Sequence, residues 1–474
     1  MSRLLLASTP AQGHAAPLLA AARHLVGRGH DVVFLTTTHY AGRVTATGAR
    51  FVALRPEADA HDLLVANPER ETSVRRGLRG VKDDLRRIFI DPAPHQYHDL
   101  CRVLAEFPAD AVIVDATFVG IAPLVVHRSP GAPATERAGF TGRPAVTGRP
   151  AVIMLGVLPL PLSSRDTAPF GLAMAPRAGW SGVIRNMVLT WLVRHIALGD
   201  IQRYAQSMLA AEGCQPVDRF IVDAPAYLVD AYLQLTVESF EYPRSDLPPS
   251  VRFIGPVLTG SATDFSEPAW WKELDADRPV VHVTQGTIDN FDLGRLVLPT
   301  IEALARQDVL VVATTGGRDP ALVHEQWRAR DKSPARRDRA RALGEPYVAS
   351  GLPGNVRVER FIPHDCLLSK VDVMVTNGGY GGVQQALAAG VPLVVAGDSE
   401  DKPEVAARVA WAGVGINLRT GRPAPGRIAD AVRRVLTDPA YAARAQTMRH
   451  EIHAHNPLRE LDLVLDELVS TAST

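Results

Sequence analysis

Short runs of apolar residues recur along the chain, and each run ends in a turn rich in glycine or small polar residues. The clearest series has an apolar run at 371–376, a glycine-rich turn at 377–382, helix-forming residues up to Ala389 and a second apolar run at 391–396. Unbroken apolar runs of this length are typical of strands buried on both faces of a sheet. The order strand, turn, helix, strand is the repeating unit of an open parallel α/β sheet, and we expect that architecture here.

The amino-terminal end shows the same order. An apolar run at 3–8 leads into a turn at 9–13, helix-forming spacing covers 17–26, and a second run occupies 32–38. His14 then lies in the turn just before the helix, at the carboxyl edge of the sheet. The same pattern predicts further strands at 110–115, 152–157, 279–284, 309–314 and 356–360, and final helices at 426–436 and 439–468.

A long helical pattern at 183–209 mixes bulky apolar residues with arginines. We interpret it as an amphipathic helix that packs on the core. Its apolar face could instead line a site for an apolar small molecule or lie on a membrane surface, and the sequence leaves these alternatives open.

Length, charge and cysteine content limit the number of domains, the kinds of binding partner and the compartment. At 474 residues the chain is too long for one ordinary core, so two or three domains are expected. Lys+Arg 51 balance Asp+Glu 51, which gives no global attraction to nucleic acid or to an anionic membrane. No uncharged apolar stretch reaches the ~18 residues of a membrane span. The cysteines, at 101, 214 and 366, are odd in number and far apart, so neither a disulfide framework nor a zinc site is expected, and we predict a cytoplasmic protein.

The glycine-rich turn is a candidate anion site. A backbone without Cβ atoms can approach a ligand closely, and the helix that follows presents free N–H groups at the positive end of its dipole. A phosphate or pyrophosphate fits such a place. The alternative is that the glycines only form a tight turn between strand and helix.

His14 and Asp115 are candidates for proton transfer, because each lies at the carboxyl end of a predicted strand. A carboxylate bonded to one imidazole nitrogen fixes the tautomer and strengthens the other nitrogen as a base. The alternatives are structural: a histidine that hydrogen-bonds at the start of a helix, and a carboxylate that caps one.

Two stretches, one in each half, resemble signatures of family-one glycosyltransferases. Residues 9–17 are similar to the motif Gly-His-x-x-Pro, whose histidine is the general base, and this assigns the base to His14 with Asp115 as its partner. Residues 376–402 resemble the nucleotide-sugar motif Thr-His-Gly-Gly…Ser…Glu-Ala…Gly-Val-Pro…Asp-Gln. The positions kept are Thr376, Gly378, Gly379, Ala386, Gly390, Val391, Pro392 and Asp401.

The chain departs from the second motif at four positions. Asn377 replaces the diphosphate-binding histidine, Gly382 a serine or threonine, Gln385 the ribose-binding glutamate and Lys402 a glutamine. Asn377 removes one possible cation from the diphosphate, and Lys402 could restore charge nearby or favour a different sugar. Gln385 should bond the ribose more weakly than a carboxylate does.

Two further loops are similar to family loops. Gln285-Gly286-Thr287 matches a Phe-Gly-Ser/Thr loop whose hydroxyl bonds a phosphate oxygen. Residues 361–364 stand where the family has Trp-x-Pro-Gln, so Phe361 is expected to stack on the base, with core packing as its alternative. The resemblance thus implies these nucleotide-sugar-binding residues: Gly286, Thr287, Phe361, His364, Asn377, Gly378, Gly379, Gly381, Gly382, Gln385, Asp401 and Lys402.

The resemblance also implies the fold known as GT-B, in which two Rossmann-like parallel-sheet α/β domains face each other across a cleft. We predict an acceptor-binding domain at 1–257 with a flexible insertion at 129–150, a linker at 258–278 and a nucleotide-sugar-binding domain at 279–450. The helix at 451–474 is expected to return to the amino-terminal domain.

The implied reaction is inverting transfer of a sugar from UDP or dTDP to a hydroxyl of a lipophilic small molecule such as a polyketide or macrolide. The nucleotide sugar is a co-substrate; no cofactor, metal or nucleic-acid partner is expected, and the protein would be a monomer or homodimer. One alternative is a catalytically impaired auxiliary protein that binds nucleotide sugars, and another is an epimerase on the same scaffold. A dehydrogenase is disfavoured because no G-x-G-x-x-G follows the first strand.

Overall fold

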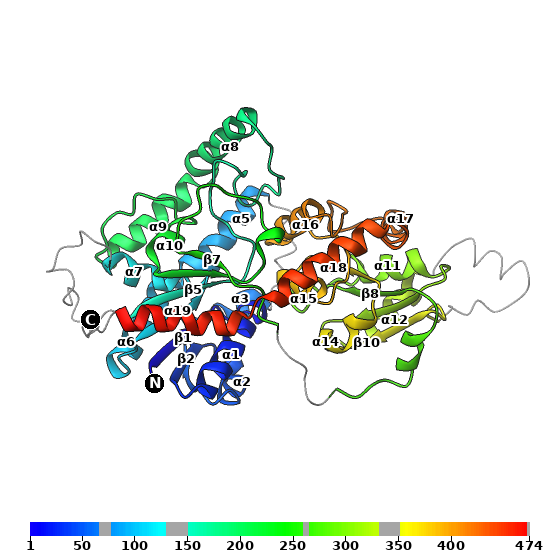
Figure 1. The fold of residues 1–474 in the computed structure, drawn as a ribbon, viewed down its shortest axis with the longest axis horizontal. Coiled ribbons are helices and arrows are strands. Elements are labelled where there is room, and N and C mark those ends of the chain that lie inside the picture. The colour runs from blue at the N-terminus through cyan, green and yellow to red at the C-terminus, as the bar shows by residue number, and fades with distance from the viewer. Residues whose placement is uncertain (66–76, 129–149, 259–264, 331–350, 472–474) are drawn as a thin grey trace, which may run out of the picture. The chain divides into compact units, whose positions relative to one another are not determined.

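The chain forms two compact units. The computed structural model describes residues 1–65, 77–128, 150–258, 265–330 and 351–471. Residues 1–259 and 452–474 make up the first unit, and residues 260–451 make up the second (Figure 1). Apart from Pro150, the predicted insertion at 129–150 lies outside the described residues.

The first unit is built on a seven-stranded sheet in the order β3-β2-β1-β4-β5-β6-β7, with every pair of neighbours parallel. Its strands are β1 (Arg3–Ala7), β2 (Asp31–Thr36), β3 (Arg50–Ala53), β4 (Ala111–Asp115), β5 (Ala151–Gly156), β6 (Ala231–Gln234) and β7 (Val251–Phe253). Its helices are α1 (Gln12–Gly27), α2 (Ala41–Thr45), α3 (His61–Val65), α5 (Leu78–Asp84), α6 (Ala93–Glu106), α7 (Ala122–Arg128), α8 (Trp180–Leu192), α9 (Gly199–Ala211), α10 (Ala224–Leu228) and α19 (Pro457–Thr471).

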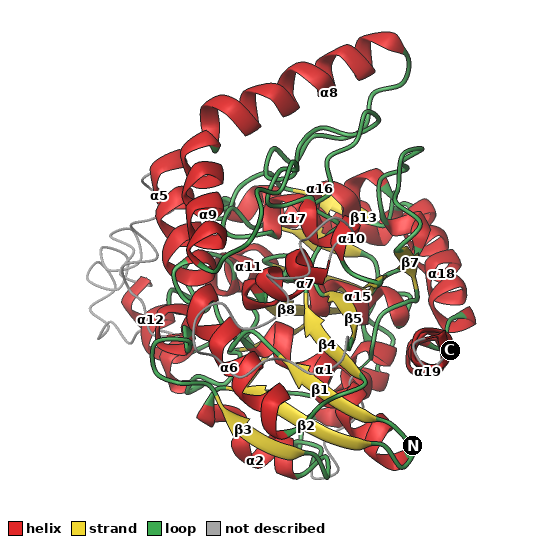
Figure 2. Ribbon diagram, turned by 90° about the vertical axis from the view of Figure 1, so that its left-hand side faces the viewer, coloured by secondary structure: helices red, strands yellow, loops and turns green. Residues whose placement is uncertain are grey.

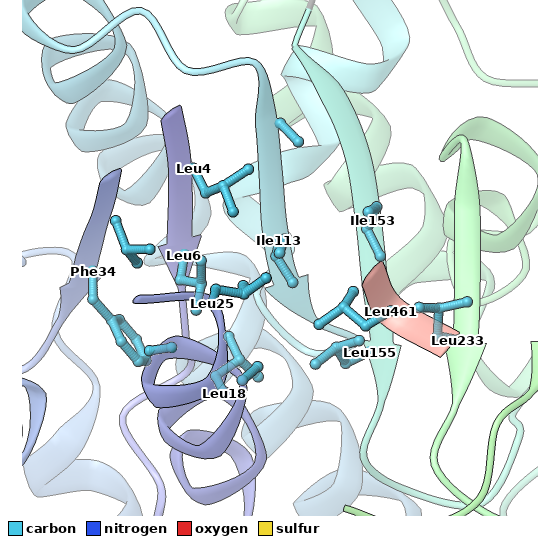
Figure 3. Close-up of a cluster of buried hydrophobic side chains, with 14 of the residues drawn as sticks. Leu4, Leu6, Leu18, Leu25, Phe34, Ile113, Ile153, Leu155, Leu233 and Leu461 are labelled. Atoms are coloured by element: carbon cyan, nitrogen blue, oxygen red, sulfur yellow. The ribbon is translucent and has the colours of Figure 1, made fainter. Parts of the chain in front are cut away.

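The last helix of the chain completes the core of the first unit. Leu6 of β1 and Leu25 of α1 belong to the same buried cluster as Leu461 of α19 (Figure 3). At the surface, His24 Nε2 and Asp462 Oδ2 lie 2.9 Å apart and join α1 to α19. The predicted return of the carboxy-terminal helix to the amino-terminal domain is therefore confirmed.

Helix α1 begins earlier than the sequence pattern indicates. It starts at Gln12, so Pro17 lies inside it and His14 belongs to its first turn rather than to the loop before it. Because Pro17 has no N–H, the helix lacks one backbone hydrogen bond, to Gly13. The earlier start fixes the backbone of His14 within regular structure.

The pattern at 183–209 is not one helix on the core. It divides into α8, a turn of π-helix at Val193–Ala197, and α9. The exposed fractions of Trp180 and Trp191 are 83% and 55%, whereas the buried face of α8 is formed by Gly182 and Asn186. The interpretation as a core helix is wrong for α8, because its apolar stripe faces solvent on a helix that extends from the body of its unit (Figures 1 and 2). It holds for α9, where Ile201 and Ala205 belong to a buried cluster.

The second unit is built on a six-stranded parallel sheet in the order β10-β9-β8-β11-β12-β13. Its strands are β8 (Val280–Thr284), β9 (Leu310–Thr314), β10 (Val356–Glu359), β11 (Val373–Thr376), β12 (Leu393–Val395) and β13 (Gly415–Asn417). Its helices are α11 (Val297–Leu304), α12 (Ala321–Arg330), α14 (His364–Leu367), α15 (Tyr380–Ala388), α16 (Lys402–Trp411), α17 (Pro425–Thr437) and α18 (Pro439–Ala454), whose last turn enters the first unit. Across both units, no helix in the described ranges is long and apolar enough to cross a membrane.

Candidate active site

His14 and Asp115 meet at one edge of the first sheet. Strands β1 and β4 are neighbours, with Ala7 in register with Val114, so the loop after β1 and the end of β4 lie side by side. His14 Nδ1 and Asp115 Oδ1 are 3.0 Å apart. Since an ionised carboxylate only accepts hydrogen bonds, Nδ1 carries a proton and Nε2 is the ring nitrogen that can exchange one.

The Asp115 carboxylate is fully buried and accepts further hydrogen bonds. The Thr9 N–H donates to Oδ2 at 2.6 Å, and the Thr117 N–H and hydroxyl donate to Oδ1 at 2.9 and 2.5 Å. Burial by itself would raise the pKa of Asp115, but these bonds and the one from His14 outweigh it and hold the pKa below its ordinary value. The carboxylate therefore stays charged behind the imidazole.

Thr117 is a member of this cluster that the sequence pattern did not single out. Its hydroxyl lies 2.9 Å from His14 Nδ1 and 2.9 Å from the Thr9 hydroxyl, so it faces the same ring nitrogen as Asp115 does. The only signal in the sequence is a threonine two residues after a strand-ending aspartate, which is too common a pattern to identify it.

In the second unit, the two predicted phosphate-binding loops lie next to each other. Thr284 and Thr376, the last residues of β8 and β11, are in register, and the turns that follow them share one sheet edge. Asn377 joins the two turns, because its Nδ2 donates to the Gln285 carbonyl at 2.6 Å. Its side chain is 6% exposed, so the amide nitrogen is used to hold the loops together.

The glycines of the turn fall into two groups. Gly378 has φ +89, and a Cβ there would lie 2.7 Å from Val395 Cγ1, so this position requires glycine for the turn itself. A Cβ added to Gly379 or Gly381 would meet nothing within 4 Å. Packing within the described chain does not explain these two glycines, and the space beside them at the start of α15 is open. Gly382, inside α15, is less open, with His364 Cε1 3.8 Å from such a Cβ.

Lys402 is directed into the protein. Its side chain is 4% exposed, and its ammonium group contacts Glu400, Ser399 Oγ at 3.1 Å and Asp289 Oδ2 at 3.6 Å. Burial alone would lower the pKa of Lys402, but the carboxylates around it raise it above the ordinary value. The lysine thus stabilises the loop before α16, and half-buried Asp401 stands at the amino end of that helix.

The remaining predicted residues differ in exposure. Thr287 is exposed beside Gly286, which has φ +69. The Phe361 ring is 59% exposed, so the alternative that it packs in the core is wrong. His364 Nδ1 lies 2.7 Å from Gln385 Oε1, which brings two predicted ligand residues into contact with each other.

The chain is similar to known proteins along almost its whole length. A family model described as the Erythromycin biosynthesis protein CIII-like, C-terminal domain, matches residues 343–468. The 4'-demethylrebeccamycin synthase of Lentzea aerocolonigenes is 41% identical over 471 residues, which is 99% of this chain and 100% of that protein. UDP-glycosyltransferase 2 of Phaeomoniella chlamydospora is 34% identical, covering 98% of this chain and 96% of the relative. The chain is a family-one glycosyltransferase.

Solved structures agree on the fold of this glycosyltransferase. The glycotransferase of kitacinnamycin superimposes with a TM-score of 0.66 at 22% identity, covering 98% of both chains. The calicheamicin glycosyltransferase CalG4 gives 0.63 at 21% identity, covering 99% of this chain and 98% of its own. The two parallel-sheet domains predicted from the sequence are thereby confirmed as the GT-B fold.

Proposed function

We propose that this glycosyltransferase moves a sugar from UDP or dTDP to a hydroxyl of a lipophilic natural product, with inversion and with His14 as the general base. The observation that supports it most is the hydrogen bond of 3.0 Å between His14 and the buried Asp115 carboxylate. This arrangement keeps the proton on Nδ1 and makes Nε2 the nitrogen that can take up the acceptor proton, as a general base requires.

The chemistry is a single displacement. The acceptor oxygen forms a bond to the anomeric carbon while the bond from that carbon to the diphosphate oxygen breaks. The acceptor proton passes to His14 Nε2, and the nucleoside diphosphate leaves with the electron pair. Asp115 stabilises the imidazolium that forms, and attack opposite the leaving group inverts the anomeric centre.

The donor assignment is supported by the second unit. Open space lies beside Gly379 and Gly381 at the start of α15, whose first N–H groups suit a diphosphate. Exposed Phe361 offers a face for a base. Among similar proteins, one is named a UDP-glycosyltransferase, and a spinosyn rhamnosyltransferase of the same fold was solved with thymidine diphosphate. Both nucleotides are therefore candidate donors.

The acceptor assignment is supported by the first unit. Helix α8 exposes Trp180, Ile184, Met187, Val188 and Trp191, which offer an apolar surface in the same unit as His14. The relatives named above include a rebeccamycin-type synthase and glycosyltransferases of kitacinnamycin and calicheamicin. A lipophilic aglycone is consistent with both facts.

The test combines binding with turnover. Nucleoside diphosphates that bind only the folded protein raise its melting temperature, so a panel of UDP, dTDP, GDP and ADP identifies the base. UDP- and dTDP-sugars are then incubated with a panel of polycyclic and macrolide aglycones. Stabilisation by UDP or dTDP without transfer or donor hydrolysis would favour the auxiliary protein, and interconversion of the nucleotide sugar without an acceptor would favour an epimerase.

Asp115→Asn should lower kcat/KM for transfer by about 100-fold. Asparagine has one acceptor oxygen where the carboxylate uses two, so it cannot serve the Thr9 N–H at Oδ2 together with the Thr117 and His14 N–H groups at Oδ1. In either orientation the negative charge that stabilises the imidazolium is lost. Transfer rates of purified variants measure the effect. Asp110→Asn changes a half-buried carboxyl just before the same strand, which accepts from the Arg3 N–H, and should leave the rate unchanged. Equal rates for Asp115→Asn and wild type would contradict the role of the carboxylate.

The same substitution has a pH signature. Because the folded pKa of Asp115 is depressed, its charge stabilises the protein above the unfolded pKa of roughly 4, and this contribution disappears as pH falls through the lower folded value. The difference in unfolding free energy between wild type and Asp115→Asn should therefore shrink in acid.

Phe361→Ala should weaken binding of UDP or dTDP by about tenfold, because one base-stacking face is lost. Phe361→Trp should bind at least as well as wild type, since indole has a larger face. Isothermal titration gives the dissociation constants. The melting temperature of the free protein should not change, because the ring is 59% exposed, and Trp411→Ala, another exposed aromatic of this unit, serves as control. Unchanged affinity in Phe361→Ala would remove this residue from the site.

A further inference from the structure

Two departures from the family motif contact each other. His364 stands where the family has glutamine, and Gln385 stands where the family has the ribose-binding glutamate. His364 Nδ1 lies 2.7 Å from Gln385 Oε1. An amide oxygen only accepts, so His364 Nδ1–H is the donor, and the bond fixes which end of the Gln385 amide carries the oxygen and which the NH₂ group.

A second histidine supports the first. His282, in the middle of β8, is fully buried, and its ring meets that of His364 edge to face at 5.5 Å. Its Nδ1 lies 3.0 Å from the Val312 carbonyl and must donate to it. Burial, followed by the nearby His364, lowers the pKa of His282 to about 3, and burial also lowers the pKa of His364 despite its bond to Gln385. Both rings are therefore neutral.

The amide nitrogen of Gln385 can still donate a hydrogen bond to a ligand. It has no hydrogen-bond partner within the described residues, and it is not sealed from solvent. A family glutamate at this position offers two acceptor oxygens, whereas Gln385 held by His364 offers two N–H donors. Position 385 therefore donates hydrogen bonds where the family residue accepts them.

We propose that His364 is a positioning residue that fixes the Gln385 amide as a hydrogen-bond donor to the pentose of the nucleotide, so that the enzyme accepts ribose and 2′-deoxyribose donors alike. This inference rests on the proposed nucleotide-sugar donor. A buried carboxylate left without the 2′-hydroxyl loses a charge-assisted bond and keeps its desolvation penalty, which discriminates strongly against the deoxy sugar. A neutral N–H left without a partner costs less.

UDP and 2′-deoxyuridine diphosphate test this directly, because they differ only in the 2′-hydroxyl. For the wild-type protein, titration calorimetry should give dissociation constants within about threefold of each other. In Gln385→Glu the carboxylate regains two acceptors, and the preference for UDP should increase by about tenfold. The double variant His364→Gln, Gln385→Glu, which restores both family residues, should show the same preference. Gln307→Glu adds the same charge at an exposed position of the same unit and should leave the ratio unchanged.

His364→Leu tests the positioning role separately. It removes the bond that holds the amide, so both nucleotides should bind several-fold more weakly while their ratio stays near that of wild type. The ring ¹⁵N signals of His364 should show a protonated Nδ1 and an unprotonated Nε2 in the wild type, and an imidazolium in Gln385→Glu.

Different results would count against the proposed nucleotide donor and against the proposed role of His364 and Gln385. Failure of the wild type to bind either nucleotide would count against the proposed donor. Binding of both, with a wild-type preference of tenfold or more for UDP that Gln385→Glu leaves unchanged, would overturn the inference alone. An Nε2-protonated tautomer of His364 would overturn it as well.

Discussion

Replacing His14 by alanine should lower the rate of sugar transfer by about 10³-fold while nucleotide binding stays unchanged. Without the imidazole, no group in the cluster can take the acceptor proton, because the Asp115 carboxylate is fully buried. Binding of UDP or dTDP should persist, since His14 belongs to the first unit and the glycine-rich turn belongs to the second. Initial rates and calorimetric titrations on the same preparations measure both quantities.

The matched control for this variant lies on the same helix. His24 forms a similar histidine–carboxylate contact, 2.9 Å from Asp462, at the other end of α1. His24→Ala should loosen α19 and lower the melting temperature, yet transfer measured well below that temperature should stay near the wild-type rate. If His14→Ala lost transfer and nucleotide binding equally, the imidazole would have a structural role and the assignment of the base would fail.

The sequence predicted the sheet elements well, because unbroken apolar runs leave little choice. Strands β1, β4, β8 and β11 were expected at 3–8, 110–115, 279–284 and 371–376, and all four are found there with ends differing by one or two residues. Apolar runs of this length are typical of parallel strands that are buried on both faces. Helix α8 was interpreted wrongly, because an amphipathic pattern shows that one face is apolar but not whether that face is covered.

The directions and contacts of several site side chains could not be predicted from the sequence. Position at the carboxyl end of a strand brought His14 and Asp115 together, and the structure places them in contact. The same reasoning located Asn377 and Lys402 at the edge of the second sheet. It did not predict that Asn377 bonds the Gln285 carbonyl or that Lys402 is enclosed by carboxylates. Such choices depend on partners distant in sequence, which the spacing of residues does not reveal.

Replacing Arg408 by methionine should destabilise the protein by about 3–5 kcal/mol. Arg408 is 1% exposed on α16, and its Nη1 donates to Glu404 Oε2 at 2.8 Å, where the glutamate side chain is 4% exposed. Methionine fills the space but leaves a buried carboxylate without this cation. Because α16 begins directly after Asp401, nucleotide binding should weaken together with stability. Urea denaturation, followed by fluorescence, gives the loss of unfolding free energy.

Two further variants test whether buried charge is the cause. Arg433→Met breaks an ion pair to Asp430 on α17 whose partners are 72% and 71% exposed, and it should leave the urea midpoint unchanged. Adding Glu404→Gln to Arg408→Met removes the stranded charge and should restore part of the lost stability, since a neutral amide is cheaper to bury than a carboxylate. If Arg408→Met alone matched Arg433→Met, water or another donor would be solvating Glu404, and the pair would not be what stabilises α16.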